Sequence, residues 1–155
     1  YARSLHALGG AWAEDANEAI ADEQEMQRTW LADLDRETLP SPVTRAYTDF
    51  LLASTLGEPA AIGQAAVLPC YWLYYEVGAR LAKRNHDAHP YRDWLATYAG
   101  DEFLASVRGA IDRCERTLAD DPDALDDAVR ACAVASRYEL DFFDQADRAW
   151  VIRDV

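Results

Sequence analysis

The middle of the chain reads LPCYWLYYEVG at residues 68–78. Pro69 lacks a backbone donor, so a helix that passes through this stretch is expected to kink just before Cys70. Cys70 and Tyr74 are four residues apart and therefore project from one helix face. The kink is expected to open that face toward a cavity, where tyrosine hydroxyls could steady a thiolate or a ligand nitrogen. A free cysteine is more often a small buried core residue, so both interpretations of Cys70 stand on this segment alone.

Helical periodicity continues on both sides of this stretch. The 7 glycines and 6 prolines fall mainly between the periodic segments, and Ser41-Pro42 has a capping serine followed by a proline suited to the first helical position. Without alternating strand patterns, the short connections predict an all-α antiparallel bundle in a single domain over residues 1–155. The predicted helices cover residues 1–13, 15–36, 42–57, 59–84, 90–98, 102–118 and 124–150.

The last of these helices carries a glutamate in an apolar stripe. An unpaired carboxylate on such a face is costly and has a raised pKa, which suits a general acid or base. A structural carboxylate that accepts hydrogen bonds from an arginine or from tyrosine hydroxyls would give the same pattern, so both interpretations of Glu139 stand. The predicted inward stripe steps by three or four residues through Leu125, Val129, Cys132, Ser136, Glu139, Phe143, Ala146 and Trp150.

Aromatic side chains are unusually dense for a small helical domain, with 8 tyrosines and 5 tryptophans. Tyr47, Tyr74, Tyr98 and Tyr138 fall on helices that could face a common interior. A planar heteroaromatic ligand would stack well in such a pocket. Ordinary packing explains some of these rings, but not so many hydroxyls near a buried cysteine and glutamate.

Composition limits the classes of partner. The 28 acidic and 15 basic residues give a formal net charge of −13, which disfavours nucleic acids and anionic membrane surfaces. The acids are spread along the chain, which favours a strongly hydrated surface over a face that recruits a basic partner. No apolar run approaches the roughly 18 residues of a membrane span and the start does not resemble a signal peptide, so we expect a cytoplasmic location.

Metal binding is not expected from the cysteines and histidines. No pair of cysteines has zinc-ligand or CxxC spacing, and the histidines do not complete a ligand set with them. Cys114 and Cys132 lack the polar neighbours of Cys70 and are interpreted as core residues. The residues concerned are Cys70, Cys114, Cys132, His6, His86 and His89.

Three ordered blocks of the sequence resemble the TenA/thiaminase II family. The blocks are AAVLPCYWLYYEVG at 65–78, HPY at 89–91 followed by Trp94 and TYAGDEF at 97–103, and SRYELDFF at 136–143. Ser41-Pro42 and AYT at 46–48 also fit. The resemblance implies a haem-oxygenase-like helical bundle that binds no haem and usually forms a homotetramer. It also implies hydrolysis of aminomethylpyrimidines in thiamine salvage, and of thiamine itself in some members, without a metal or organic cofactor.

The resemblance also implies roles for five residues. Cys70 would be the nucleophile and Glu139 the acid/base, as in the cysteine-bearing branch of the family. Tyr47, Tyr74 and Tyr98 would line the pocket and hydrogen-bond to those two groups. The family normally begins with further helices that include a pyrimidine-binding aspartate, and Tyr1 resembles a position just after them, so the domain is expected to be N-terminally incomplete. A pyrimidine-binding regulatory module of the same fold and an acidic interaction protein are the alternatives.

Overall fold

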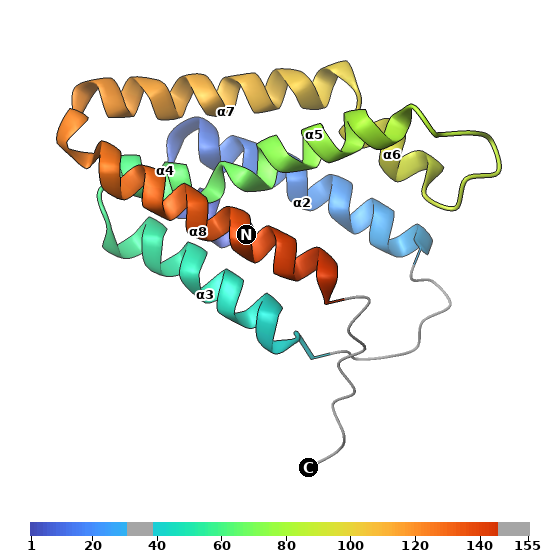
Figure 1. The fold of residues 1–155 in the computed structure, drawn as a ribbon, viewed down its shortest axis with the longest axis horizontal. Helices are drawn as coiled ribbons and strands as arrows, with labels where there is room; N and C mark the ends of the chain where they lie inside the picture. The colour runs from blue at the N-terminus through green and yellow to red at the C-terminus, as the bar shows by residue number, and fades with distance from the viewer. Residues whose placement is uncertain (31–38, 146–155) are drawn as a thin grey trace, which may run out of the picture.

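The computed structural model describes residues 1–30 and 39–145. Within these ranges the chain forms helices and no strands (Figure 1), which confirms the predicted all-α class. The elements in chain order are α1 (Ala2–Leu8), α2 (Gly10–Trp30), α3 (Pro42–Gly57), α4 (Ala60–Val67), α5 (Pro69–Ala82), α6 (Arg92–Tyr98), α7 (Asp101–Asp120), a 3₁₀ turn (Pro122–Ala124) and α8 (Leu125–Asp144).

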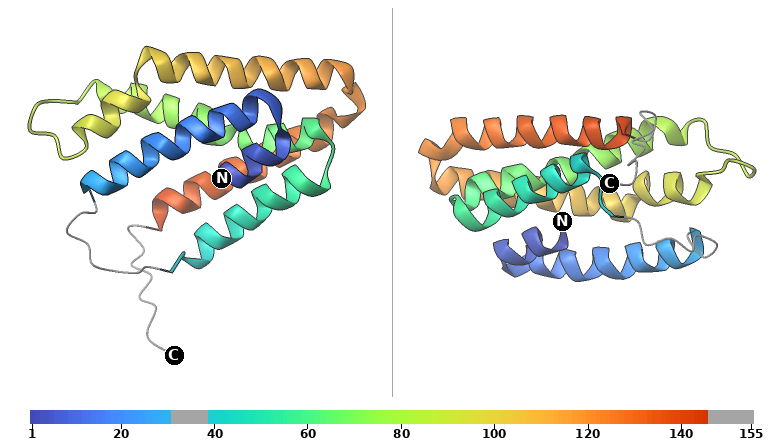
Figure 2. Two further views of the ribbon diagram at one scale, coloured as in Figure 1. Left: turned by 180° about the vertical axis from the view of Figure 1, so that it is seen from behind. Right: turned by 90° about the horizontal axis from the view of Figure 1, so that it is seen from below.

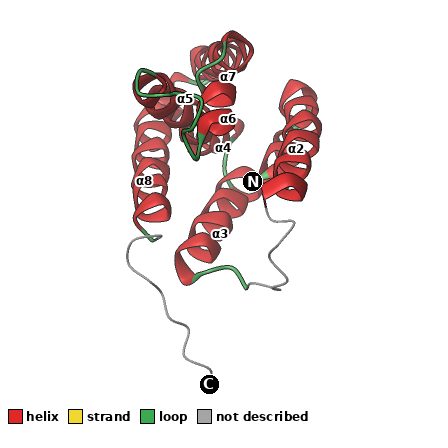
Figure 3. Cartoon of the chain, turned by 90° about the vertical axis from the view of Figure 1, so that its right-hand side faces the viewer, coloured by secondary structure: helices red, strands yellow, loops and turns green. Residues whose placement is uncertain are grey.

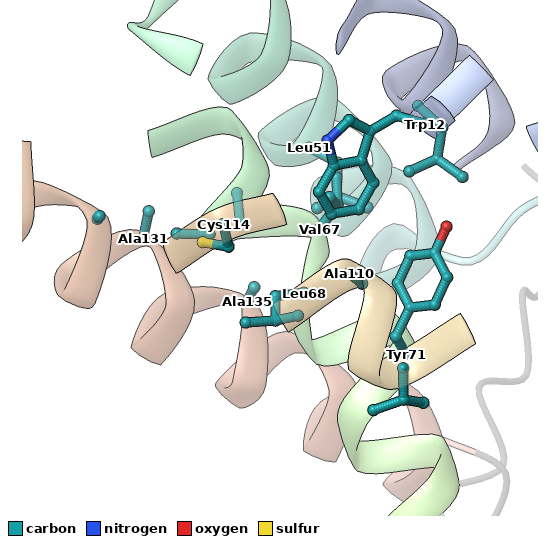
Figure 4. Close-up of a cluster of buried hydrophobic side chains, with 14 of the residues drawn as sticks. Trp12, Leu51, Val67, Leu68, Tyr71, Ala110, Cys114, Ala131 and Ala135 are labelled. Carbon is teal, nitrogen blue, oxygen red and sulfur yellow. The ribbon is translucent and has the colours of Figure 1, made fainter. Parts of the chain in front are cut away.

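The helices pack in layers. α2 lies on one side of the bundle and α8 on the other, with α3, α4 and α5 between them (Figures 2 and 3). α4 packs mainly against α8, where the buried side chains of α8 are alanines that allow the two helices to approach closely. The central core cluster combines these alanines with side chains of α2, α3, α4, α5 and α7 (Figure 4). In the part of the chain that the structure describes, no helix has the length and apolar character needed to cross a membrane.

The first helix break falls earlier than predicted. α1 ends at Leu8 because Gly9 and Gly10 have φ angles of 70° and 53°, which glycine adopts without a Cβ clash. The predicted break near residue 14 is therefore wrong, and Asp15 lies within α2. Residues 31–36 of the second predicted helix lie outside the described residues.

The predicted kinked helix over 59–84 is two helices. α4 ends at Val67 and Pro69 begins α5, with Leu68 between them in α-helical backbone geometry (φ −55°, ψ −40°). Proline is tolerated in the first turn because the N–H groups of that turn lack intrahelical acceptors. The change of direction expected before Cys70 is thus made by a new helix start.

Two other helices differ from prediction in detail. α6 begins at Arg92 rather than Pro90, and the His89 Nδ1 accepts a hydrogen bond of 3.1 Å from the Tyr91 N–H in the turn before it. In α8 the predicted inward stripe is wrong at Leu125, Val129 and Phe143, which are 50, 59 and 42% exposed. It is confirmed at Glu139, which is buried, and at Cys132, which packs against the core, while Ser136 is half-buried. Ala146 and Trp150 lie outside the described residues. The residues of α8 that are buried are Ala128, Ala131, Ala135 and Glu139.

Candidate active site

Three helices bring a thiol, a phenol and a carboxyl group together. Cys70 is the second residue of α5, directly after the proline that starts the helix, and is half-buried. Tyr47 lies in the middle of α3 and is 6% exposed, and Glu139 lies near the end of α8 and is 3% exposed. The Ser41 cap fixes the start of α3, since its Oγ accepts a hydrogen bond of 3.0 Å from the Thr44 N–H.

The Tyr47 hydroxyl joins the other two groups. It donates to Glu139 Oε1 over 2.7 Å and lies 3.0 Å from Cys70 Sγ. A phenol has a single hydrogen, so when that hydrogen is given to the carboxylate the thiol must donate to the phenol oxygen. The three groups then form one hydrogen-bonded chain from sulfur to carboxylate.

Glu139 has a second oxygen that is free for a ligand. Its Oε2 atom is buried and has no hydrogen-bond partner among the described residues. Burial raises the pKa of Glu139, and the Tyr47 hydrogen bond and the nearby Cys70 thiol oppose this shift in part. A buried carboxyl group with one unused oxygen is suited to exchange a proton with a bound ring nitrogen.

The thiol and the phenol are held in their protonated forms. Burial and the nearby Glu139 charge raise the pKa of Cys70, although the Tyr47 hydrogen bond opposes the rise. Burial, Cys70 and Glu139 likewise raise the pKa of Tyr47. Cys70 must therefore lose its proton during any reaction in which it acts as nucleophile, because the thiolate is the reactive form.

A cavity of about 500 Å³ lies against this hydrogen-bonded chain. All five residues singled out from the sequence line it, namely Cys70, Glu139, Tyr47, Tyr74 and Tyr98. The ring of Tyr74 packs 5.2 Å from that of Tyr98, which in turn meets Phe103 edge-on at 4.9 Å. The volume lies within the usual range for small-molecule sites, and the aromatic wall suits a planar ring.

Comparison with known proteins identifies the family of the chain. Residues 17–149 match the TENA/THI-4/PQQC family. The chain belongs to this family. It also superposes on a structure titled "TenA homologue protein from P.horikoshii OT3" with a TM-score of 0.81, at 27% identity over 95% of this chain and 75% of that one. The haem-oxygenase-like fold of TenA proteins, expected from the resemblance, is thereby confirmed.

TenA-family relatives with named functions are also similar in sequence. The chain is 50% identical over 138 residues to the thiamine biosynthesis multifunctional protein ThiED of Corynebacterium glutamicum. The aligned stretch covers 88% of this chain and 18% of that protein. It is 36% identical over 111 residues to the aminopyrimidine aminohydrolase of Bacillus subtilis, covering 70% of this chain and 47% of that enzyme. The chain thus spans less than half the length of these two relatives.

The cavity also contains residues that the sequence analysis of this TenA-family chain did not single out. Asp15 and Glu18 were not predicted because nothing in the sequence places α2 across from α8. Tyr71 directly follows Cys70, and no spacing in the sequence indicates that its side chain also reaches the cavity. Tyr138, which was expected near the common interior, packs behind Tyr47 with ring centroids 5.4 Å apart and planes at 14°. The unpredicted lining residues include Tyr1, Asp15, Glu18, Thr44, Tyr71, Phe103, Ser106 and Phe142.

The other cysteines and the histidines lie elsewhere. Cys114 is buried in the core and Cys132 packs against it, as the sequence analysis predicted for core residues. The rings of His86 and His89 meet each other at 5.4 Å in the turn region before α6. Among the residues that the structure describes, no cluster of histidine, cysteine and acidic side chains is arranged to hold a metal ion.

Proposed function

We propose that this TenA-family chain carries the reaction centre of a hydrolase that converts aminomethylpyrimidines and thiamine to hydroxymethylpyrimidine in thiamine salvage. The observation that carries the proposal is the chain of contacts from Cys70 through Tyr47 to Glu139 at the wall of one aromatic cavity. The family membership and the name of the Bacillus subtilis relative support the same reaction class.

In the proposed mechanism Glu139 moves one proton between sulfur and ring. The carboxylate accepts the Cys70 proton through Tyr47 and delivers it to ring nitrogen N1 while sulfur bonds to the adjacent ring carbon. Electron density released into the ring expels the amine, or the thiazole, from the exocyclic methylene. Water adds to that methylene, and its proton goes to the departing amine, or to solvent when the neutral thiazole departs. Glu139 then removes the N1 proton and returns it to sulfur as the carbon–sulfur bond breaks.

Tyr74 and Tyr98 would bind the pyrimidine by stacking and by their hydroxyl groups. Both rings line the cavity, and Tyr74 also packs against Phe143 at 5.5 Å. Rigid aromatic walls hold a planar substrate in one plane, which places the reacting carbon over the thiol. No metal or organic cofactor has a part in this mechanism.

The test is made with the variants Cys70→Ser and Glu139→Gln in the natural full-length polypeptide. Release of hydroxymethylpyrimidine from aminomethylpyrimidine and from thiamine should fall by about two orders of magnitude or more in each variant, the usual scale for an acid/base group. Cys132→Ser and Glu58→Gln are the matched controls, because neither Cys132 nor Glu58 lines the cavity. Near-normal turnover in Cys70→Ser or Glu139→Gln would refute the assigned role, and ligand binding without turnover by the unmodified protein would favour the regulatory module.

We further propose that copies of the chain associate, as the family resemblance implies for a homotetramer. An exposed apolar strip on α8 supports association; we call it the α8 stripe, and it consists of Leu125, Val129, Leu140 and Phe143, which are 50, 59, 49 and 42% exposed. Large exposed apolar side chains in a row are typical of interfaces. The single domain over residues 1–155, the strongly hydrated acidic surface and the cytoplasmic location stay predictions of the sequence.

A further inference from the structure

The α2 wall of the cavity carries two carboxylates. Asp15 and Glu18 both line the cavity, and their spacing of three residues places them on the same face of α2. α2 and α8 lie on opposite sides of the bundle (Figure 3). The acidic pair therefore faces the cavity from a different helix layer than Glu139.

Asp15 is held in place by two donors. The Tyr71 hydroxyl donates to Asp15 Oδ2 over 3.1 Å, and the Arg113 guanidinium donates to the same oxygen. Arg113 is itself fixed, since its Cζ lies 4.4 Å from the centroid of the Trp12 ring. Both hydrogen bonds fall on one oxygen of Asp15, so the other oxygen can meet a ligand without disturbing this arrangement. Groups that are already ordered before binding lose little freedom when the ligand arrives.

Glu18 adds a second carboxylate to the α2 wall of the cavity. It forms no ion pair with any residue in the described ranges. The residues known to line the cavity include the carboxyl groups of Asp15, Glu18 and Glu139 and no lysine, arginine or histidine. A cavity lined by one sign of charge concentrates ligands of the opposite sign and repels those of the same sign.

An independent feature shows that the same cavity is built for a ligand. Glu139 is 3% exposed, and its Oε2 is buried without a partner among the described residues. A polar atom in that position is costly unless a ligand completes its hydrogen bonds. With about 500 Å³ available, the cavity has room for a second ring beside a pyrimidine at Glu139.

We propose that Asp15 and Glu18 bind the positively charged leaving group of the substrate and exclude leaving groups that carry a phosphate. This inference rests on the proposed function, because it assigns the pyrimidine to the Cys70 and Glu139 side of the cavity. The thiazolium of thiamine is the matching group, since it is cationic while bonded to the methylene and departs as neutral thiazole. Its phosphate ester would bring an anion toward the carboxylates of Asp15 and Glu18, and the cation beside them, Arg113, already pairs with Asp15.

The experiment compares binding of thiamine and thiamine monophosphate by calorimetry in the full natural polypeptide, with Cys70→Ser as background to prevent turnover. We expect the background protein to bind thiamine at least about tenfold more tightly than the phosphate ester, which corresponds to about 1.4 kcal/mol. Adding Glu18→Lys should reduce this preference by about tenfold or more, because an anion is replaced by a cation that attracts phosphate. Adding Glu58→Lys, the same change at an exposed residue outside the cavity, should leave the preference unchanged.

Asp15→Asn should weaken thiamine binding. It also removes the negative charge that pairs with Arg113, so the variant is expected to be less stable. Glu18 is exposed and its substitution by lysine is compatible with a helix, so Glu18→Lys decides the question if Asp15→Asn does not fold. An unchanged preference in Glu18→Lys, or no preference in the background protein, would overturn the inference while hydroxymethylpyrimidine release by the unmodified enzyme still upheld the proposed function. Failure of the unmodified protein both to bind and to hydrolyse these compounds would overturn the two together.

Discussion

The Tyr47 hydroxyl donates its hydrogen to Glu139 Oε1 over 2.7 Å, although both residues are almost fully buried and 92 positions apart in the chain. Because this donation uses the only phenol hydrogen, the contact of 3.0 Å between Tyr47 and Cys70 places the thiol as donor. A proton can then pass from sulfur to carboxylate by a shift along two hydrogen bonds. Although the pKa of the Cys70 thiol is raised, the thiol can therefore lose its proton to Glu139 and become the nucleophilic thiolate without a histidine as base.

The variant Tyr47→Phe should interrupt that path. We expect kcat/KM for aminomethylpyrimidine to fall at least about tenfold, since positioned proton transfer contributes roughly 10² to 10⁴. The Tyr47 hydrogen bond lowers the pKa of Glu139, so its removal should raise that pKa. Because the carboxylate form accepts the thiol proton, the rising limb of the pH–rate profile should move to higher pH.

Tyr75→Phe is the matched control for this variant. Tyr75 is half-buried, packs against the core and does not line the cavity. Its profile should overlay that of the unmodified enzyme. A Tyr47→Phe profile that also overlays it would show that the phenol has no part in proton transfer.

Replacement of Glu139 by glutamine should stabilise the protein at neutral pH while it abolishes activity. Burial raises the pKa of the folded-state carboxyl group above its unfolded value, so the folded state binds the proton more strongly. The stability from this group is therefore complete below the unfolded pKa of about 4.3 and is lost as pH rises through the folded value. Glutamine removes the charged form but can still accept the Tyr47 hydrogen bond.

Thermal unfolding measured across pH checks this second prediction. At pH 7.5 the Tm of Glu139→Gln should exceed that of the unmodified protein. The increase should be about 2 to 4 °C for each kcal/mol of unfolding free energy gained by no longer burying a charged carboxylate. The difference should vanish near pH 4, where both side chains are neutral. A Tm difference that does not change with pH would mean that the folded-state pKa of Glu139 is not raised.

Local signals predicted some elements well. The start of α3 follows from a serine cap and a proline, which act through atoms within one turn. Pro69 also predicted a change of helix direction just before Cys70, although the chain begins a new helix at this proline instead of kinking a continuous one. The site residues were predicted because the quoted blocks contain them, whereas composition and periodicity left the roles of Cys70 and Glu139 open.

Features that depend on how helices meet could not be predicted in this way. α8 buries alanines because α4 lies close against it, so the larger side chains Leu125 and Val129 are displaced to the surface. A hydropathy pattern assigns the larger apolar side chains to the buried face, so it predicts the wrong face of α8 as buried. The contribution of Asp15 to the cavity likewise depends on a packing arrangement between α2, α5 and α7.

Gly78 in α5 should not tolerate a methyl group. A Cβ at this position would lie 2.9 Å from the backbone carbon and the Cβ of Tyr98, and backbone atoms cannot move without shifting α6. We expect Gly78→Ala to cost about 1 to 3 kcal/mol of unfolding free energy, the range for overpacking. The same shift should raise KM, because Tyr98 lines the cavity.

Gly57→Ala is the matched control for Gly78→Ala. Gly57 ends α3, is exposed and has no atom within 4 Å of a built Cβ. Alanine there should leave stability unchanged or raise it by up to about 1 kcal/mol, because alanine loses less backbone entropy in a helix. Denaturant titration of both variants provides the measurement. If Gly78→Ala were as stable as Gly57→Ala, α5 and α6 would be able to move apart without cost.

The α8 stripe should control self-association. Val129→Glu and Leu140→Glu each place a charge in the middle of the stripe, where its desolvation in an interface would cost several kcal/mol if unpaired. Sedimentation velocity should therefore show smaller species for either variant than for the unmodified protein at equal concentration. Val134→Glu is the control, because Val134 is 43% exposed but points from the far side of the same helix. If circular dichroism shows all three variants to be folded and all sediment as the unmodified protein does, copies of the chain do not meet through α8.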